Sequence, residues 1–331
     1  MNPLAEFPGF PLGPGTPTQR RFRIGGLSVL IDSDLPLAPG TFIEKLERFA
    51  ADEVGPDVVR AWHHFGYPEF DQWELGDRVT SLAPWLVYRR DDAWTYVETP
   101  ATGEPGERVL VFSPDYREVH IFNGGRLKER FLRGSSASLT MMPTDQVWLV
   151  QLMPLFGACF LHAGAAVLDG RGILFVGGAR AGKSSLVEML NPLSTVLSDD
   201  RIIARHFPQG GRIYGTWSHG DYPAASPQDA QLSAVVLLSR AERDLLEPVH
   251  DPTIVSRALL GAIVRPLVTR DWMERTLIII EGLVRDAAAY KLEWSGSPQI
   301  VSEVVRIAGD ANARDRTRRG HTEGRLPSEG P

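Results

Sequence analysis

The chain has 331 residues, of which 43% are hydrophobic, and it carries a formal net charge of -6 with a pI near 5.8. This size and composition are typical of a soluble globular protein with two domains. The acidic balance leaves no broad basic field, so neither a nucleic acid nor a membrane is expected as a partner. A single cysteine, Cys159, excludes an internal disulfide and a cysteine-based zinc site.

The terminal segments lack the patterns of a signal peptide. Met1–Pro8 is proline-rich without a basic stretch, and no apolar run approaches the roughly 18 residues that a membrane span needs. We therefore expect a cytoplasmic protein. Prolines recur through residues 1–20, which predicts a flexible arm, and the polar composition of residues 309–331 predicts a disordered tail.

Residues 21–140 are predicted to form an amino-terminal β-rich α+β module. A strand pair is expected around the Gly25-Gly26 turn, and Thr41–Phe49 has the apolar spacing of a helix. Short aromatic strands separated by Asp, Gly and Pro clusters then predict an antiparallel meander. These strands are expected at residues 86–90, 94–98, 108–112 and 118–122.

Residues 141–308 are predicted to form an α/β nucleotide-binding domain, which opens with a helix over residues 143–153. The order strand, glycine loop, helix, strand follows, as in a mixed α/β core. The strands are expected at residues 173–176, 195–198, 233–238 and 276–280, and the helices at residues 183–190 and 253–267.

A phosphate loop is the most specific motif in the chain. Gly177-Gly-Ala-Arg-Ala-Gly-Lys-Ser184 matches G-x-x-x-x-G-K-[ST] directly after a predicted strand and before a predicted helix. Such a loop binds the phosphates of ATP or GTP with backbone N–H groups, and its serine hydroxyl ligates Mg²⁺. Arg180 faces either a phosphate or solvent. The expected nucleotide-binding residues are Gly177, Gly178, Ala179, Arg180, Ala181, Gly182, Lys183, Ser184 and Ser185.

An acid pair, Asp199-Asp200, follows the second strand of this unit, where open α/β sheets place their ligands. One carboxylate can bind magnesium, and the other can accept a proton from an attacking hydroxyl. The alternative is a capped surface turn. His162 lies in a strand-like run that the Asp169-Gly170 hairpin signal pairs with residues 173–176. From the residues alone, His162 is equally a core histidine or a partner of the base.

The run from Leu161 to Asp200 resembles the kinase domain of HPr kinase/phosphorylase and its relatives in the phosphoenolpyruvate carboxykinase-like group. His162, the phosphate loop and the acid pair match the order of parts in that family. The resemblance implies a P-loop kinase fold. It implies that His162, Lys183 and Asp199 are catalytic, with Asp199 as the base on a serine hydroxyl. It also implies that Ser184 and Asp200 hold Mg²⁺.

This sequence departs from the family in two features. It has no clear counterpart of the basic loop by which HPr kinases engage HPr, and its amino-terminal module does not clearly match theirs. Gly215–Gly220 resembles a glycine loop found in many relatives. The family includes kinases that phosphorylate precursor peptides in lasso-peptide biosynthesis, and the resemblance also allows a homo-oligomer. We therefore expect an ATP- and Mg²⁺-dependent serine kinase acting on a peptide or small protein. The alternatives are a kinase for a metabolite hydroxyl and a non-catalytic nucleotide sensor.

Overall fold

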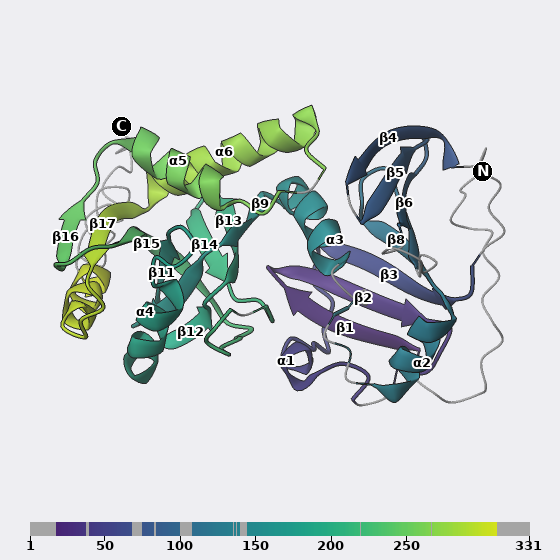
Figure 1. Cartoon of the computed structure of the whole chain (residues 1–331), viewed down its shortest axis with the longest axis horizontal. Coiled ribbons are helices and arrows are strands. Elements are labelled where there is room, and N and C mark those ends of the chain that lie inside the picture. Colours follow the sequence, from purple (N-terminus) through teal and green to yellow (C-terminus); the bar gives the residue numbers. More distant parts are fainter. Residues whose placement is uncertain are drawn as a thin grey trace, which may run out of the picture. The chain divides into compact units, whose positions relative to one another are not determined.

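The computed structural model describes residues 18–37, 40–67, 75–82, 84–99, 108–134, 136, 138–139, 144–218, 220–265 and 267–309. The predicted arm and tail therefore lie outside the described residues, apart from residues 18–20 and 309. The chain forms two compact units, Met1–Phe156 with Arg265–Thr269, and Gly157–Val264 with Arg270–Pro331. The fold is mixed α/β, with extensive sheets and few helices (Figure 1).

The first unit contains, among its described residues, an eight-stranded sheet with the order β1-β2-β3-β8-β7-β6-β5-β4. β3 pairs in parallel with β2 and β8, and all other neighbours are antiparallel. The strands are β1 (Gln19–Ile24), β2 (Leu27–Ser33), β3 (Val58–Phe65), β4 (Asp77–Leu82), β5 (Trp85–Arg89), β6 (Trp94–Glu98), β7 (Arg108–Phe112) and β8 (Glu118–Asn123).

Local turn chemistry explains the parts of this sheet that the sequence predicted. Gly25 and Gly26 both have positive φ, of 58° and 79°, which a two-residue hairpin of this hand requires. The predicted strand pair and the antiparallel meander are confirmed. The central strand β3 was not predicted, because Val58–Phe65 carries two adjacent histidines and breaks the alternation of apolar residues.

The helices of the first unit are α1 (Glu44–Glu47), α2 (Gly125–Arg133) and α3 (Thr144–Leu152), followed by the 3₁₀ turn η3 (Met153–Phe156). The helix expected over Thr41–Phe49 is thus a single turn, around the fully buried Leu46. The helix expected over residues 143–153 is confirmed as α3. It belongs to the first compact unit, although the sequence placed it at the start of the nucleotide-binding domain.

The second unit is built, in its described part, on a nine-stranded sheet. Its path is β12-β10-β11-β15-β14-β13-β9, and β17 pairs with β15 and β16. β11, β15 and β17 are parallel. The strands are β9 (Ala158–His162), β10 (Gly164–Leu168), β11 (Arg171–Val176), β12 (Thr195–Ser198), β13 (Arg201–Phe207), β14 (Gly210–Tyr214), β15 (Asp229–Arg240), β16 (Leu245–Pro248) and β17 (Ala288–Trp294).

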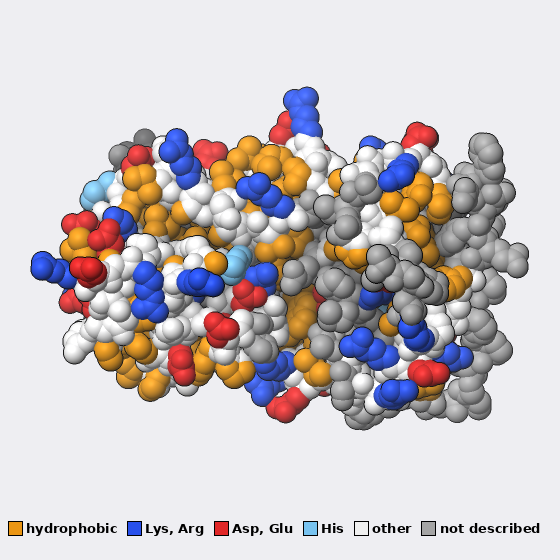
Figure 2. Space-filling model, in the orientation of Figure 1, with side chains coloured by type: hydrophobic (Ala, Val, Ile, Leu, Met, Phe, Trp, Pro, Cys, Tyr) orange, Lys and Arg blue, Asp and Glu red, His pale blue; other side chains and the backbone are white. Residues whose placement is uncertain are grey.

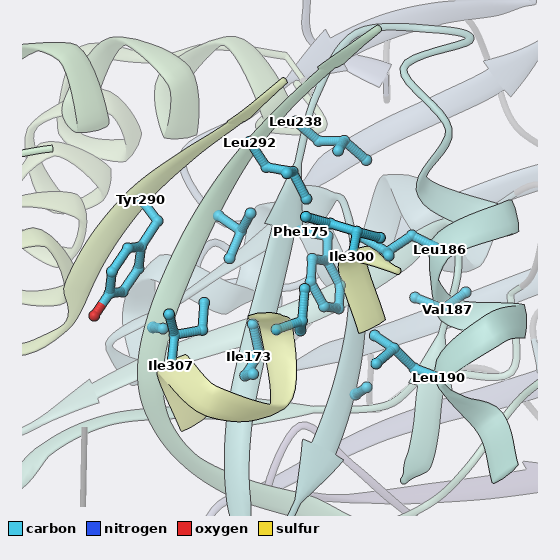
Figure 3. Packing of buried hydrophobic residues seen from close by; sticks show 14 of the residues in the cluster. Ile173, Phe175, Leu186, Val187, Leu190, Leu238, Tyr290, Leu292, Ile300 and Ile307 are labelled. Carbon is cyan, nitrogen blue, oxygen red and sulfur yellow. The ribbon is translucent and has the colours of Figure 1, made fainter. Parts of the chain in front are cut away.

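Helices cover both faces of this second sheet. α4 (Lys183–Leu190) packs against β10 and β12, whereas α5 (Pro252–Ala262) and α6 (Arg270–Asp286) pack against β9 and β15 (Figure 1). Figure 3 shows the core on the α4 side, where residues of β11, β15, β17, α4 and a helix over residues 300–309 converge around the fully buried Phe175. Burying a side chain of this size contributes about 1.5 to 3 kcal/mol.

The strand expected over residues 276–280 is wrong, because this run lies inside α6. Its β-branched residues favour a strand, but the burial has helical spacing. Trp272, Thr276, Ile279, Ile280 and Leu283 are buried, whereas Leu277 and Ile278 are exposed. This i, i+4, i+7 spacing is that of one helix face. The helix expected over residues 253–267 ends earlier, at Ala262.

The surface of the second unit is of mixed charge in the view of Figure 2, with acidic and basic side chains interspersed among apolar ones. Within the described part of the chain, every helix is too short or too polar to cross a lipid bilayer.

Candidate active site

The glycine loop lies between β11 and α4, as the motif predicts. β11 ends at the buried Val176, and α4 begins at Lys183. Gly182 has a φ of +97°, and a Cβ atom there would lie 2.5 Å from the ring of Trp294. Only glycine fits both the backbone conformation and the space, so this turn requires a glycine at position 182. Arg180, with a φ of +65°, is exposed at the top of the loop.

Lys183 is folded back over the loop. Its Nζ donates to the carbonyl oxygens of Gly177, at 2.9 Å, and Gly178, at 3.2 Å. Burial lowers the pKa of Lys183 below its ordinary value, and Arg201 adds to this shift, while Asp200 and Asp199 oppose it. The ammonium is thus held at the loop and lies within electrostatic reach of the acid pair.

His162 and the acid pair meet where two connections of the chain cross. Ala163 links β9 to β10, and Asp199-Asp200 links β12 to β13. The backbone N–H of Ala163 donates to the carbonyl oxygen of Asp200 at 3.1 Å. The antiparallel register of β9 and β13 also pairs His162 with Arg201. The strand-like run that was expected around His162 is therefore two strands, of which β10 makes the predicted hairpin with β11.

Asp200 connects His162 to Arg201 through a single carboxylate oxygen. Its Oδ1 lies 3.1 Å from Nε2 of His162 and accepts from Nη1 of Arg201 at 2.6 Å. The side chains of His162 and Asp200 are 43% and 22% exposed, so both are accessible to a ligand. Burial lowers the pKa of His162 below its ordinary value of 6.5, and Lys183 and Arg201 lower it further, while Asp200 opposes them. The imidazole is therefore neutral at pH 7 and can accept a proton.

Asp199 has a different environment from Asp200. It is 1% exposed, and its Oδ1 and Oδ2 accept from the backbone N–H groups of Gly220, at 2.6 Å, and Tyr222, at 2.9 Å. A buried carboxylate with two backbone donors is well satisfied. Asp199, the residue expected to be the base, thus accepts two hydrogen bonds from residues 220–222.

The loop Gly215–Gly220 borders the site. Thr216 Oγ1 donates to the carbonyl oxygen of Arg201 at 2.8 Å, and Ser198 Oγ donates to that of Ser218 at 2.7 Å. A Cβ at Gly215 would lie 2.0 Å from the carbonyl oxygen of Ser226, so a larger residue is excluded. His219 lies outside the described residues. These contacts fasten the loop to the end of β12 and the start of β13, on either side of the acid pair.

Arg201 is a site residue that the sequence analysis missed. It directly follows the acid pair, its side chain is 20% exposed, and it contacts Asp200 through both the carboxylate and the backbone oxygen. In a sequence, an arginine adjacent to two acids is usually interpreted as neutralising their charge. Only the register of β9 and β13 shows that Arg201 lies beside His162.

The oxygen ligands available for magnesium are few. Within the described residues, no group of three or more His, Cys, Asp or Glu side chains could hold a metal ion. Ser184 in the first turn of α4 and the half-exposed Asp200 supply two oxygens. A hydroxyl and a carboxylate are ligand types that suit a Mg²⁺ ion that keeps waters and bridges phosphates, because Mg²⁺ is seldom caged by protein alone.

Comparison with known proteins gives a weak structural likeness. No protein-family model and no curated protein matches the chain. A solved structure of the Hpr(Ser) kinase/phosphatase from Coxiella burnetii is similar over 36% of this chain and 93% of that one, with 16% sequence identity. Its TM-score of 0.22 is too low to support a shared fold, so the chemistry of the site rests on its geometry.

Proposed function

We propose that the second unit is a phosphotransferase that binds ATP or GTP with Mg²⁺ and transfers the terminal phosphoryl group to a hydroxyl. The observation that carries this proposal is the position of Lys183. Its ammonium is held at a glycine loop by two carbonyl oxygens. It is also one cause of the lowered pKa of His162, and Asp200 and Asp199 oppose the lowering of its own pKa. These relations support a site in which Lys183 would bind phosphate close to a group that accepts the proton.

The loop would bind phosphate through backbone groups. The first N–H groups of α4 have no partner within the helix, and the helix dipole places partial positive charge at the same end. The open space beside Gly178, where a Cβ would meet nothing within 4 Å, allows a ligand to approach the backbone. Lys183 would exchange its two carbonyl contacts for the outer phosphates, which bind an ammonium more strongly than a neutral carbonyl does.

Proton acceptance is assigned to Asp200, with His162 as its partner. Asp200 is more exposed than Asp199 and lies 3.1 Å from the neutral imidazole. A base must reach the acceptor hydroxyl, and the two oxygens of Asp199 are directed at backbone N–H groups instead. Arg201 fixes the orientation of the Asp200 carboxylate through its hydrogen bond at 2.6 Å. Asp199 would act indirectly, by positioning residues 220–222.

Magnesium would be held by the hydroxyl of Ser184 and, through a bridging water, by Asp200, so that the carboxylate itself stays available as the proton acceptor. The ion would neutralise charge on the phosphates during transfer. The chain's own contribution is to orient the phosphates with the loop and Lys183, and to keep the Asp200 carboxylate available to the hydroxyl. Because the transfer is mainly a matter of positioning and charge, such a site needs no covalent intermediate.

The acceptor is proposed to be a serine hydroxyl in a peptide or small protein. An exposed His162–Asp200 pair suits a substrate that approaches from solvent. The test is transfer of labelled phosphate from ATP, with Mg²⁺, to a library of peptides that each contain one serine. Matched peptides with alanine in place of serine serve as controls. Labelling of the serine peptides alone supports the proposal. Transfer only to a small-metabolite fraction would show that the acceptor is a metabolite hydroxyl and not a peptide serine.

A further inference from the structure

Arg240 and Trp294 lie side by side at the ends of two parallel strands. The register of β15 and β17 pairs the two residues, and the backbone N–H of Ala241 donates to the carbonyl oxygen of Trp294 at 3.1 Å. The guanidinium carbon of Arg240 lies 4.4 Å from the centroid of the Trp294 ring. This distance is that of a close cation–π contact.

The Trp294 ring is rigidly held against the glycine loop. It is fully buried, and its Nε1 donates to the carbonyl oxygen of Ser297 at 3.1 Å. A Cβ at Gly182 would lie 2.5 Å from this ring and 3.0 Å from the guanidinium carbon of Arg240. The pair therefore adjoins the loop at the residue that directly precedes Lys183.

Arg240 is exposed although it is stacked on a buried ring. Among the residues that the structure describes, no carboxylate forms an ion pair with it. Gly296 leaves room beside it, because a Cβ there would lie 2.9 Å from Nη1 of Arg240. The guanidinium of Arg240 thus lies over the Trp294 ring. The plain alternative is that Arg240 only shields the ring from water.

We infer that the guanidinium of Arg240, supported by Trp294, is the platform on which the base of the bound nucleotide stacks. This inference rests on the proposed function, because it assumes that a nucleotide binds at the loop. Guanidinium groups stack on planar rings, and every nucleobase offers such a face. The carboxyl ends of β11, β15 and β17 lie at one edge of the sheet, where α/β proteins bind their ligands.

The division of charge favours the base over the phosphates as the partner of Arg240. Lys183 and the amino terminus of α4 already provide positive charge for the phosphates. Arg240 lies beyond Gly182, on the side where a Cβ atom would point, whereas a phosphate loop binds its anion with backbone N–H groups. The base extends away from the phosphates and can reach a neighbouring platform.

The test compares two probes in the full chain, MgATP and magnesium tripolyphosphate, by calorimetry. Arg240→Ala should weaken MgATP binding roughly tenfold, because it removes the surface on which the base stacks, and should leave tripolyphosphate binding unchanged. Arg240→Lys keeps the charge but loses the planar face, so it should also weaken MgATP binding. Arg243→Ala removes an exposed arginine of the following turn and is the matched control.

Four outcomes would overturn the inference. Equal weakening of both probes in Arg240→Ala would show that Arg240 contacts phosphate. Unchanged MgATP affinity in Arg240→Ala, or full affinity in Arg240→Lys, would show that the stacked face is not used. Failure of the wild-type chain to bind either probe would remove the proposed function itself. Unchanged melting temperatures would establish that both variants fold.

Discussion

Nε2 of His162 lies 3.1 Å from Oδ1 of Asp200, and this contact joins the end of β9 to the connection between β12 and β13. Because burial, Lys183 and Arg201 all lower the pKa of His162, the imidazole should titrate below its ordinary value of 6.5. Lys183→Gln removes one of the two cations and should raise this pKa. NMR titration of the histidines in the wild type and in Lys183→Gln measures the shift. An equal pKa of His162 in the two proteins would contradict the proximity of Lys183.

The two acids should respond differently to amidation. Asp200→Asn should leave stability near that of the wild type and lower turnover by roughly a hundredfold to ten-thousandfold, because it removes the proposed base. It should also weaken MgATP binding, because Asp200 is a proposed holder of the metal ion.

Asp199→Asn should instead lower the free energy of unfolding by about 1 to 3 kcal/mol, because the amide cannot accept from both Gly220 and Tyr222. Thermal unfolding and turnover are measured on both variants. A stable Asp199→Asn chain without turnover would return the role of base to Asp199.

Gly182 and Gly178 provide a matched pair in the loop. Gly182→Ala combines a φ of +97° with a contact of 2.5 Å to Trp294, so it should destabilise the second unit by about 2 kcal/mol or more. Gly178→Ala meets nothing within 4 Å and should leave stability unchanged. Urea unfolding distinguishes the two, and equal stability of both variants would contradict the fit of the loop against β17.

The first unit should lose stability as the pH falls from 7 to 5. Burial is the largest cause that lowers the pKa of His63 and of His120, each to about 4. Between pH 6.5 and 4 the unfolded chain therefore binds more protons, so stability is present at neutral pH and is lost on acidification. The loss should be about 1 to 2 kcal/mol per histidine by pH 5.

Amide hydrogen exchange of β3 and β8, corrected for its intrinsic pH dependence, measures this loss. His120→Phe should reduce the pH dependence, whereas replacing the exposed His250 by alanine should not. Exchange that does not change between pH 7 and pH 5 would contradict the burial of these histidines.

Local sequence signals predicted the elements around the glycine loop closely. The Asp169-Gly170 hairpin, α4 and β12 lie where expected, because turn residues, the loop motif and Asn191-Pro192 set their limits within a few residues. By contrast, the pairing of β9 with β13 depends on contacts between residues about forty positions apart, which no local pattern encodes. For that reason Arg201 was missed, and the different surroundings of Asp199 and Asp200 were not foreseen.

Longer-range packing also decided the elements that the sequence misassigned. The run at residues 276–280 is rich in β-branched residues, but it is helical because α6 buries one face against the sheet. β3 is parallel to both of its neighbours, so its partners lie far away in the sequence. No hairpin turn therefore indicates this strand in the sequence. Propensity gives way to tertiary context in both cases.

If Lys183 belongs to a nucleotide site, its removal must weaken MgATP binding, which calorimetry measures on the wild-type chain, Lys183→Ala and Lys291→Ala. Lys291 is half-exposed and paired with Glu293, which makes it a suitable control. The wild type and Lys291→Ala should bind MgATP alike, and Lys183→Ala should bind it roughly tenfold to hundredfold more weakly. Equal MgATP affinity in all three chains, or no binding by the wild type, would contradict it.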